Sequence, residues 1–213
     1  MPRALAISDL TVRPDAPLLI VDVDEVLAHF MAGFERFVGR HGYEMRIDRF
    51  ALFQNLYRPG DAECLDFETG KALFDDFFRD GAEDLDPVHG AADALATLST
   101  RAGVVILTNA PAHALESRTG WLSTHGFDYP MILHSGLKGP AILEMSGLTR
   151  GPACFIDDLL PNLDSSEQSA PAVKRFQIIA DDRLRPLAPI APDRHDFHDD
   201  WTTLGPALEA AIR

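Results

Sequence analysis

The sequence predicts an α/β fold, in which a parallel β-sheet carries helices on both of its faces. Short apolar runs typical of buried strands alternate with segments of helical periodicity from residue 89 onward. An earlier run, residues 18–21, is entirely aliphatic and stops at two aspartates spaced two apart. Parallel strands connected through helices need right-handed crossovers, so the pattern indicates a Rossmann-like sheet.

The individual elements follow from these periodicities and from the glycine, proline and capping residues between them. We expect strands at residues 18–21, 104–107, 131–133, 153–156 and 176–180. We expect helices at residues 30–41, 73–80, 91–100, 112–125, 141–145 and 201–212. Two segments rich in proline or polar residues predict loops, at 166–172 and 183–195.

Residues 28–88 differ in composition from the rest of the chain. Nine of the 13 phenylalanines lie in this segment, and their spacing predicts an all-helical unit with a small core of its own. We therefore expect two domains, one formed by residues 1–27 and 89–213 and the other by residues 28–88. Four polar side chains of the segment could reach a site at the sheet edge, but we expect them at the surface: His29, Arg36, Arg40 and Arg58.

The composition fits a soluble globular protein and argues against several classes of partner. With 19 Lys and Arg residues against 33 Asp and Glu residues, the formal net charge is −14, which repels nucleic acid polymers and anionic membrane surfaces. Cys64 and Cys154 are too few for a disulfide framework or a thiolate zinc site. No apolar stretch suits a signal peptide or a membrane span. We expect a cytoplasmic protein, of open oligomeric state, with no nucleic-acid or membrane partner.

The two aspartates after the first strand indicate a metal site. Residues two apart in an extended chain point the same way, so Asp22 and Asp24 are aimed at one volume outside the sheet. Ligands bind at this edge in open α/β sheets, and two close carboxylates stay ionised only beside a cation. In the simpler alternative, Asp22 caps the strand and Asp24 opens the next turn.

Further residues suited to chemistry follow later strands of the same sheet: Thr108 and Asn109, Lys138, and Asp157 and Asp158. Because parallel strands end at one edge, these side chains and the two earlier aspartates are expected to converge on one crevice. Four carboxylates, a hydroxyl and one ammonium suit Mg²⁺ shared with a substrate phosphate. Each residue also has a structural alternative: a strand end for Thr108, a solvated loop lysine for Lys138 and a helix cap for Asp158.

Four short motifs in this order resemble those of the haloacid dehalogenase superfamily, in its phosphatase branch. They are residues 22–26 (DVDEV), residues 105–109 (VILTN), Lys138 and residues 155–158 (FIDD). The resemblance covers nearly the whole chain. It implies a catalytic core formed by residues 1–27 and 89–213, and a helical cap at residues 28–88 that excludes water and selects the substrate.

The resemblance also implies roles for the site residues. Asp22 would attack the substrate phosphorus and form an aspartyl-phosphate, while Asp24 would protonate the leaving oxygen and then deprotonate the attacking water. Thr108 and Asn109 would bind phosphoryl oxygens, and Lys138 would offset the charge on the nucleophile and the phosphate.

A Mg²⁺ cofactor is implied in the same way. Asp22, the backbone carbonyl of Asp24, and Asp157 would hold it, with Asp158 as a direct or water-mediated partner. Asn162 either supports this metal site or serves the turn after Pro161, so the completing ligand stays open between Asp158 and Asn162.

Taken together, the resemblance implies a Mg²⁺-dependent phosphatase acting on a small soluble phosphomonoester, such as a nucleotide or sugar phosphate. One alternative is a phosphate-ester-binding module on the same fold without turnover. A dehalogenase is disfavoured because that branch lacks the acid/base carboxylate that Asp24 would provide. A phosphonatase or a phosphomutase also remains open.

Overall fold

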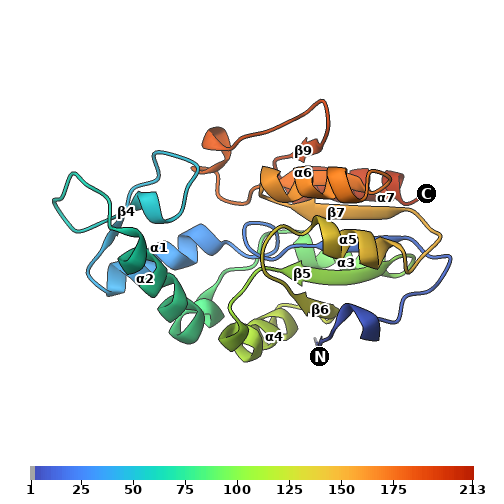
Figure 1. Cartoon of the computed structure of the whole chain (residues 1–213), viewed down its shortest axis with the longest axis horizontal. Helices are drawn as coiled ribbons and strands as arrows, with labels where there is room; N and C mark the ends of the chain where they lie inside the picture. Colours follow the sequence, from blue (N-terminus) through green and yellow to red (C-terminus); the bar gives the residue numbers. More distant parts are fainter. Residues whose placement is uncertain (1–2) are drawn as a thin grey trace.

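A seven-stranded parallel sheet forms the centre of the computed structural model, which describes residues 3–213 (Figure 1). In sheet order the strands are β1 (Arg3–Ala4), β6 (Pro130–Leu133), β5 (Gly103–Thr108), β2 (Leu18–Val21), β7 (Ala153–Asp157), β8 (Lys174–Ile178) and β9 (Asp196–His198). All neighbours pair in parallel. β2 lies between β5 and β7, so the three strands followed by predicted site residues are adjacent.

Helices cover both faces of this sheet, which confirms the predicted fold class. They are α1 (Phe30–Arg40), α2 (Phe67–Asp80), α3 (Ala91–Ser99), α4 (Leu115–Thr124), α5 (Gly139–Ser146), α6 (Leu160–Ser169) and α7 (Trp201–Ala211). Leu18 and Ile20 pack in one hydrophobic cluster with α5 and α6. Leu19 and Val21, which point to the opposite face, pack with α3, α4 and α7. β2 is therefore buried on both sides, and this is why its sequence is uniformly aliphatic.

One helix and two strands of the sheet domain are not among the elements expected from the sequence: α6 and the short edge strands β1 and β9. Residues 166–169 belong to α6 and are not part of a loop. The buried side of this helix carries small polar residues, including Ser165 and Ser166, so the sequence lacks the apolar period that marks a helix. β9 is a short edge strand in a polar segment, where alternation is equally weak.

Residues 28–88 lie at one end of the sheet, in the blue-to-green part of Figure 1. The expectation that they are entirely helical is wrong, because a two-stranded antiparallel sheet, β3 (Glu44–Met45) and β4 (Leu56–Tyr57), accompanies α1 and α2. Each of these strands has only two residues, too few to show an alternating pattern. Short 3₁₀ turns at Phe53–Asn55 and Ala82–Asp84 complete the segment.

The aromatic side chains of α1 and α2 pack against one another. Ring centroids of Phe77 lie 5.4 Å from Phe30 and 5.3 Å from Phe34. These rings belong to the same cluster as Val21 and Val23 beside the sheet, so the segment has no core separate from that of the sheet. The division into domains at residues 28 and 88 stays a prediction. Between residues 3 and 213, no helix combines the length and apolar character needed to cross a membrane.

α5 approaches α6 unusually closely at Gly139, next to Lys138. A Cβ atom on Gly139 would lie 2.2 Å from the backbone oxygen of Ser165 and 2.4 Å from its hydroxyl. The Gly139 N–H donates a hydrogen bond to that hydroxyl at 3.1 Å. Only glycine permits this approach, which fixes the start of α5 and therefore the position of Lys138.

We expect the Gly139→Ala substitution to destabilise the protein by about 2 kcal/mol or more, since the added methyl group meets backbone that cannot move aside. The matched control is Gly120→Ala in α4, where nothing lies within 4 Å of a Cβ and the helix should gain about 0.5–1 kcal/mol. Urea unfolding measures both values. Equal effects of the two substitutions would contradict the close approach.

Candidate active site

One buried ammonium group joins the ends of two neighbouring strands. Lys138 Nζ lies 2.7 Å from Asp22 Oδ1, after β2, and 2.7 Å from Asp157 Oδ2, at the end of β7. The side chain of Lys138 is 1% exposed. Burial opposes its charge, but Asp157 and Asp22 outweigh burial and raise the pKa of Lys138. Lys138 is therefore a protonated bridge and not a solvated loop lysine.

Asp158 adds a third carboxylate, and oxygen atoms of Asp22, Asp157 and Asp158 all lie within 4.8 Å of one another. Burial, with repulsion from Asp157, raises the pKa of Asp158 well above its ordinary value. Burial also raises the pKa of Asp22 to about 7, although Lys138 partly opposes this. Three carboxylates around one ammonium leave an excess of two negative charges when all are ionised, which equals the charge of one divalent cation.

The donor set fits Mg²⁺, which prefers carboxylate oxygens in a compact group. The Asn162 Nδ2 group donates to both oxygens of Asp157, at 3.0 and 3.2 Å. The Leu159 N–H donates to Asp157 Oδ1 at 2.9 Å. These contacts fix the orientation of Asp157. The choice between Asp158 and Asn162 as the completing metal ligand stays a prediction.

Asp24 is held separately from this group, by a residue that the sequence analysis missed. Arg118 Nη2, on α4, lies 2.9 Å from Asp24 Oδ1 and 3.0 Å from Oδ2. Arg118 is 1% exposed, and its guanidinium carbon lies 5.1 Å from the ring centre of Phe78. A signal was present: Arg118 is spaced at helical intervals from the buried residues Ala114 and Leu122, which places a cation on a buried face.

Glu25 was also missed as a structural residue. Its backbone has a φ of 59°, in the left-handed region. One carboxylate oxygen accepts the N–H of Met31 at 2.7 Å, and the other accepts the N–H of Asp181 at 2.6 Å. Burial raises the pKa of Glu25 to about 7. Glu25 thus fastens the turn after β2 to the start of α1 and to the segment after β8.

Thr108 and Asn109 lie at the end of β5, as predicted, but in different environments. The Asn109 amide donates to the carbonyl of Gly136 at 2.9 Å, and its oxygen has no partner among the described residues. Thr108 is fully buried, and its hydroxyl likewise has no partner within residues 3–213. Asn109 lines a cavity at the strand ends. The phosphate-binding role of Thr108 and Asn109 stays a prediction.

A cavity of about 310 Å³ lies between the strand ends and residues 28–88. Its polar lining includes most of the predicted site residues: Asp22, Asp24, Asn109, Lys138, Asp158 and Asn162. Asp157 lies beside them, under Lys138 and Asn162. The convergence expected from the parallel strands is therefore present. His29, Arg36, Arg40 and Arg58 do not line this cavity.

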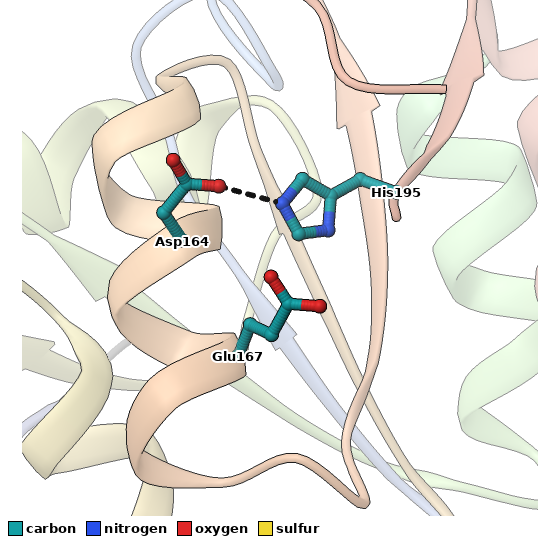
Figure 2. Close-up of side chains that lie close together, drawn as sticks. All are labelled: Asp164, Glu167 and His195. Atoms are coloured by element: carbon teal, nitrogen blue, oxygen red, sulfur yellow. Dashed lines mark hydrogen bonds and ion pairs between the residues drawn. The ribbon is translucent and has the colours of Figure 1, made fainter. Parts of the chain in front are cut away.

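A second acidic cluster lies away from the cavity, where Asp164 and Glu167 of α6 face His195 (Figure 2). The His195 Nε2–H donates to Asp164 Oδ1 at 2.9 Å. Arg194 Nη1 lies 2.6 Å from Asp164 and 2.8 Å from Glu167. Arg175 Nη2 also lies 3.8 Å from Glu167 Oε1. Two guanidinium groups thus balance the two carboxylates, so the cluster is an ion-pair network that holds residues 194–195 against α6, and it does not call for a metal.

Comparison with known proteins gives matches in structure only. No family model and no curated protein matches the sequence. A haloacid dehalogenase-like hydrolase from Streptococcus pneumoniae shares 14% identity at a TM-score of 0.59, covering 91% of this chain and 98% of that one. A HAD-superfamily hydrolase of subfamily IA from Geobacter sulfurreducens shares 16% identity at a TM-score of 0.54, covering 93% and 100%.

A third solved structure is D,D-heptose 1.7-bisphosphate phosphatase from B. bronchiseptica, in complex with magnesium and phosphate. It shares 12% identity at a TM-score of 0.53, covering 91% of this chain and 98% of that one. At such low identity these likenesses establish the fold, which is that of the haloacid dehalogenase-like hydrolases. The resemblance inferred from the four motifs is thus confirmed at the level of the fold.

We expect the Asp158→Asn substitution to stabilise the metal-free protein by about 1 kcal/mol or more, or about 2–4 °C for a chain of this size, because a buried carboxylate without an ion pair is removed. The same substitution should reduce the stabilisation that added Mg²⁺ gives. Thermal unfolding with EDTA and with Mg²⁺ measures both effects.

The matched control for this experiment is Asp164→Asn, in the second acidic cluster, which should keep the full wild-type response to Mg²⁺. If Asp164→Asn lost the stabilisation by Mg²⁺ and Asp158→Asn kept it, the metal would bind at Asp164, Glu167 and His195. That result would contradict the site at Asp22, Asp157 and Asp158.

Proposed function

We propose that the protein is a Mg²⁺-dependent phosphatase that hydrolyses a small phosphomonoester through an aspartyl-phosphate intermediate. The observation that carries this proposal is the placement of Asp22. Its carboxylate lines the cavity, with one oxygen paired to Lys138 and with Asp157 and Asp158 at its side. A carboxylate held in this way is oriented for attack on a phosphorus atom.

The group around Asp22 accounts for the charge of a phosphate ester. Lys138 faces both Asp22 and the cavity, so its ammonium offsets negative charge on the nucleophile and on phosphoryl oxygens. Asp22, Asp157 and Asp158 would hold Mg²⁺, with the backbone carbonyl of Asp24. When bound, the cation supplies the Lewis-acid charge that lets an anionic phosphate approach these carboxylates.

Asp24 supplies the proton transfers that the two steps need. It lines the cavity beside Asp22, and its side chain is 22% exposed. Its protonated form would give a proton to the leaving oxygen as the P–O bond breaks. The resulting carboxylate, oriented by Arg118, would then remove a proton from the water that attacks the aspartyl-phosphate and releases Asp22.

The alternatives have less support. A dehalogenase has no use for a second carboxylate at the position of Asp24, which here lines the cavity. A module that binds phosphate esters without turnover would not need the nucleophile, the acid/base carboxylate and the acidic group together. No observation on this chain favours a phosphomutase or a phosphonatase over simple hydrolysis.

The direct test is a panel of phosphomonoesters assayed with Mg²⁺ and with EDTA, using the wild type, Asp22→Asn and Asp164→Asn. Loss of the nucleophile should lower kcat/KM by at least about 10³-fold, while Asp164→Asn, which lies outside the cavity, should retain wild-type activity. Turnover that survives Asp22→Asn or EDTA undiminished would refute the proposal.

Arg118 is proposed as a positioning residue that acts through Asp24. Arg118→Met should lower kcat by about 10-fold or more with little change in KM, because a misplaced acid/base group slows the chemical step and not binding. Arg118→Lys should restore part of the loss. The control is Arg101→Met, which breaks the exposed pair between Arg101 and Glu209 and should leave kcat unchanged. A raised KM at constant kcat for Arg118→Met would exclude this role.

A further inference from the structure

The cavity has a polar end at the strand ends and an apolar wall opposite it. Every lining residue that comes from segment 28–88 is apolar: Phe30, Met31, Phe50, Ala51, Leu52 and Phe74. Leu159 and Leu184 extend this wall on the sheet side. The two ends differ in chemistry, so they must meet different parts of a ligand.

The wall carries no charge that could hold a second anionic group. Lys138 is the one cationic residue among those lining the cavity, and its ammonium group already forms ion pairs with Asp22 and Asp157. Five of the six arginines of the segment pair with carboxylates outside the cavity lining, for example Arg36 with Asp86 at 2.9 Å and Arg40 with Asp84 at 3.6 Å. The sixth, Arg58, does not line the cavity. A second phosphate would therefore meet carboxylates and phenyl rings without a counter-ion.

The wall also lacks polar side chains that could replace water around a hydroxylated group. Sugar or ribose hydroxyl groups placed against Leu52 and Phe74 would lose hydrogen bonds to water without side-chain partners. An alkyl or aryl group there would instead leave water for an apolar surface. The volume of about 310 Å³ is at the lower end for small-molecule pockets, so the ligand must be compact.

We propose that the substrate is a monophosphate ester of a compact, apolar alcohol, with the phosphate at the strand ends and the apolar group against the wall of segment 28–88. This inference rests on the proposed phosphatase function. It replaces the nucleotide or sugar phosphate expected from the sequence with a narrower class, and it makes Leu52 and Phe74 specificity-determining residues.

The test uses primary alkyl phosphates of increasing length: ethyl, butyl and hexyl phosphate. The leaving alkoxides have similar intrinsic reactivity, so differences in kcat/KM report contacts with the wall. We expect kcat/KM to rise by about fourfold per methylene group until the cavity is filled. Glycerol 1-phosphate, glucose 6-phosphate and butane-1,4-diol bisphosphate should each be at least about tenfold poorer than butyl phosphate.

A matched pair of substitutions locates the effect. Leu52→Asn places a polar group on the wall and should flatten the dependence on chain length. The control is the same substitution on α5, Leu143→Asn, because Leu143 is 53% exposed and does not line the cavity. This variant should keep the dependence on chain length. A flattened series in both variants would contradict the assignment of the wall.

The outcomes separate this inference from the function on which it rests. Efficient turnover of hydroxylated or doubly phosphorylated esters, with no gain along the alkyl series, would overturn the inference and leave the phosphatase function intact. Absence of turnover for every ester would overturn the phosphatase function. In that case calorimetry with ethyl, butyl and hexyl phosphonate decides: affinity that rises with chain length supports the apolar wall, and equal affinities overturn it.

Discussion

The position of the Lys138 ammonium group is the constraint on which the rest of this structure depends. It lies between Asp22 and Asp157, so it joins the ends of two adjacent strands through side chains that are almost entirely buried. Burying two carboxylates this close together would be strongly unfavourable without it. Gly139 lets the start of α5 approach α6 closely enough to put Lys138 there. Two ionised carboxylates already exceed the charge of one ammonium, and Asp158 raises the excess to two negative charges. This imbalance is the physical reason for a divalent cation.

The acidic residues around the cavity and on α6 fall into groups with separate partners. Asp24 has Arg118, and Glu25 has two backbone N–H groups, so neither depends on a metal. Asp164 and Glu167 have Arg194 and Arg175. Among these groups, the one of Asp22, Asp157 and Asp158 has the largest excess of negative charge, because three carboxylates share the single ammonium of Lys138. Chemistry is thereby confined to one end of the cavity, while the opposite wall is free to select a ligand by its apolar surface.

The sequence was informative where strands end and less so where side chains from different elements meet. The aliphatic run before Asp22 and the polar residues after β5 and β7 were enough to predict a parallel sheet with one functional edge, because period and strand direction are local properties. α6 was not predicted, because small polar residues such as Ser165 and Ser166 form much of its buried side. The pairing of Arg118 with Asp24 joins residues 94 positions apart, and the apolar cavity wall depends on how α1, α2 and the connection between them pack. Neither is encoded in a local pattern.

The central claim is that one divalent cation binds among Asp22, Asp157 and Asp158. The most direct measurement is a crystal structure of the protein with Mn²⁺ in place of Mg²⁺, located by anomalous scattering. We expect one strong peak, with oxygens of Asp22 and Asp157 at about 2.0–2.3 Å and Lys138 still beside them. A peak at Asp164, Glu167 and His195 alone, or no peak at saturating Mn²⁺, would contradict it.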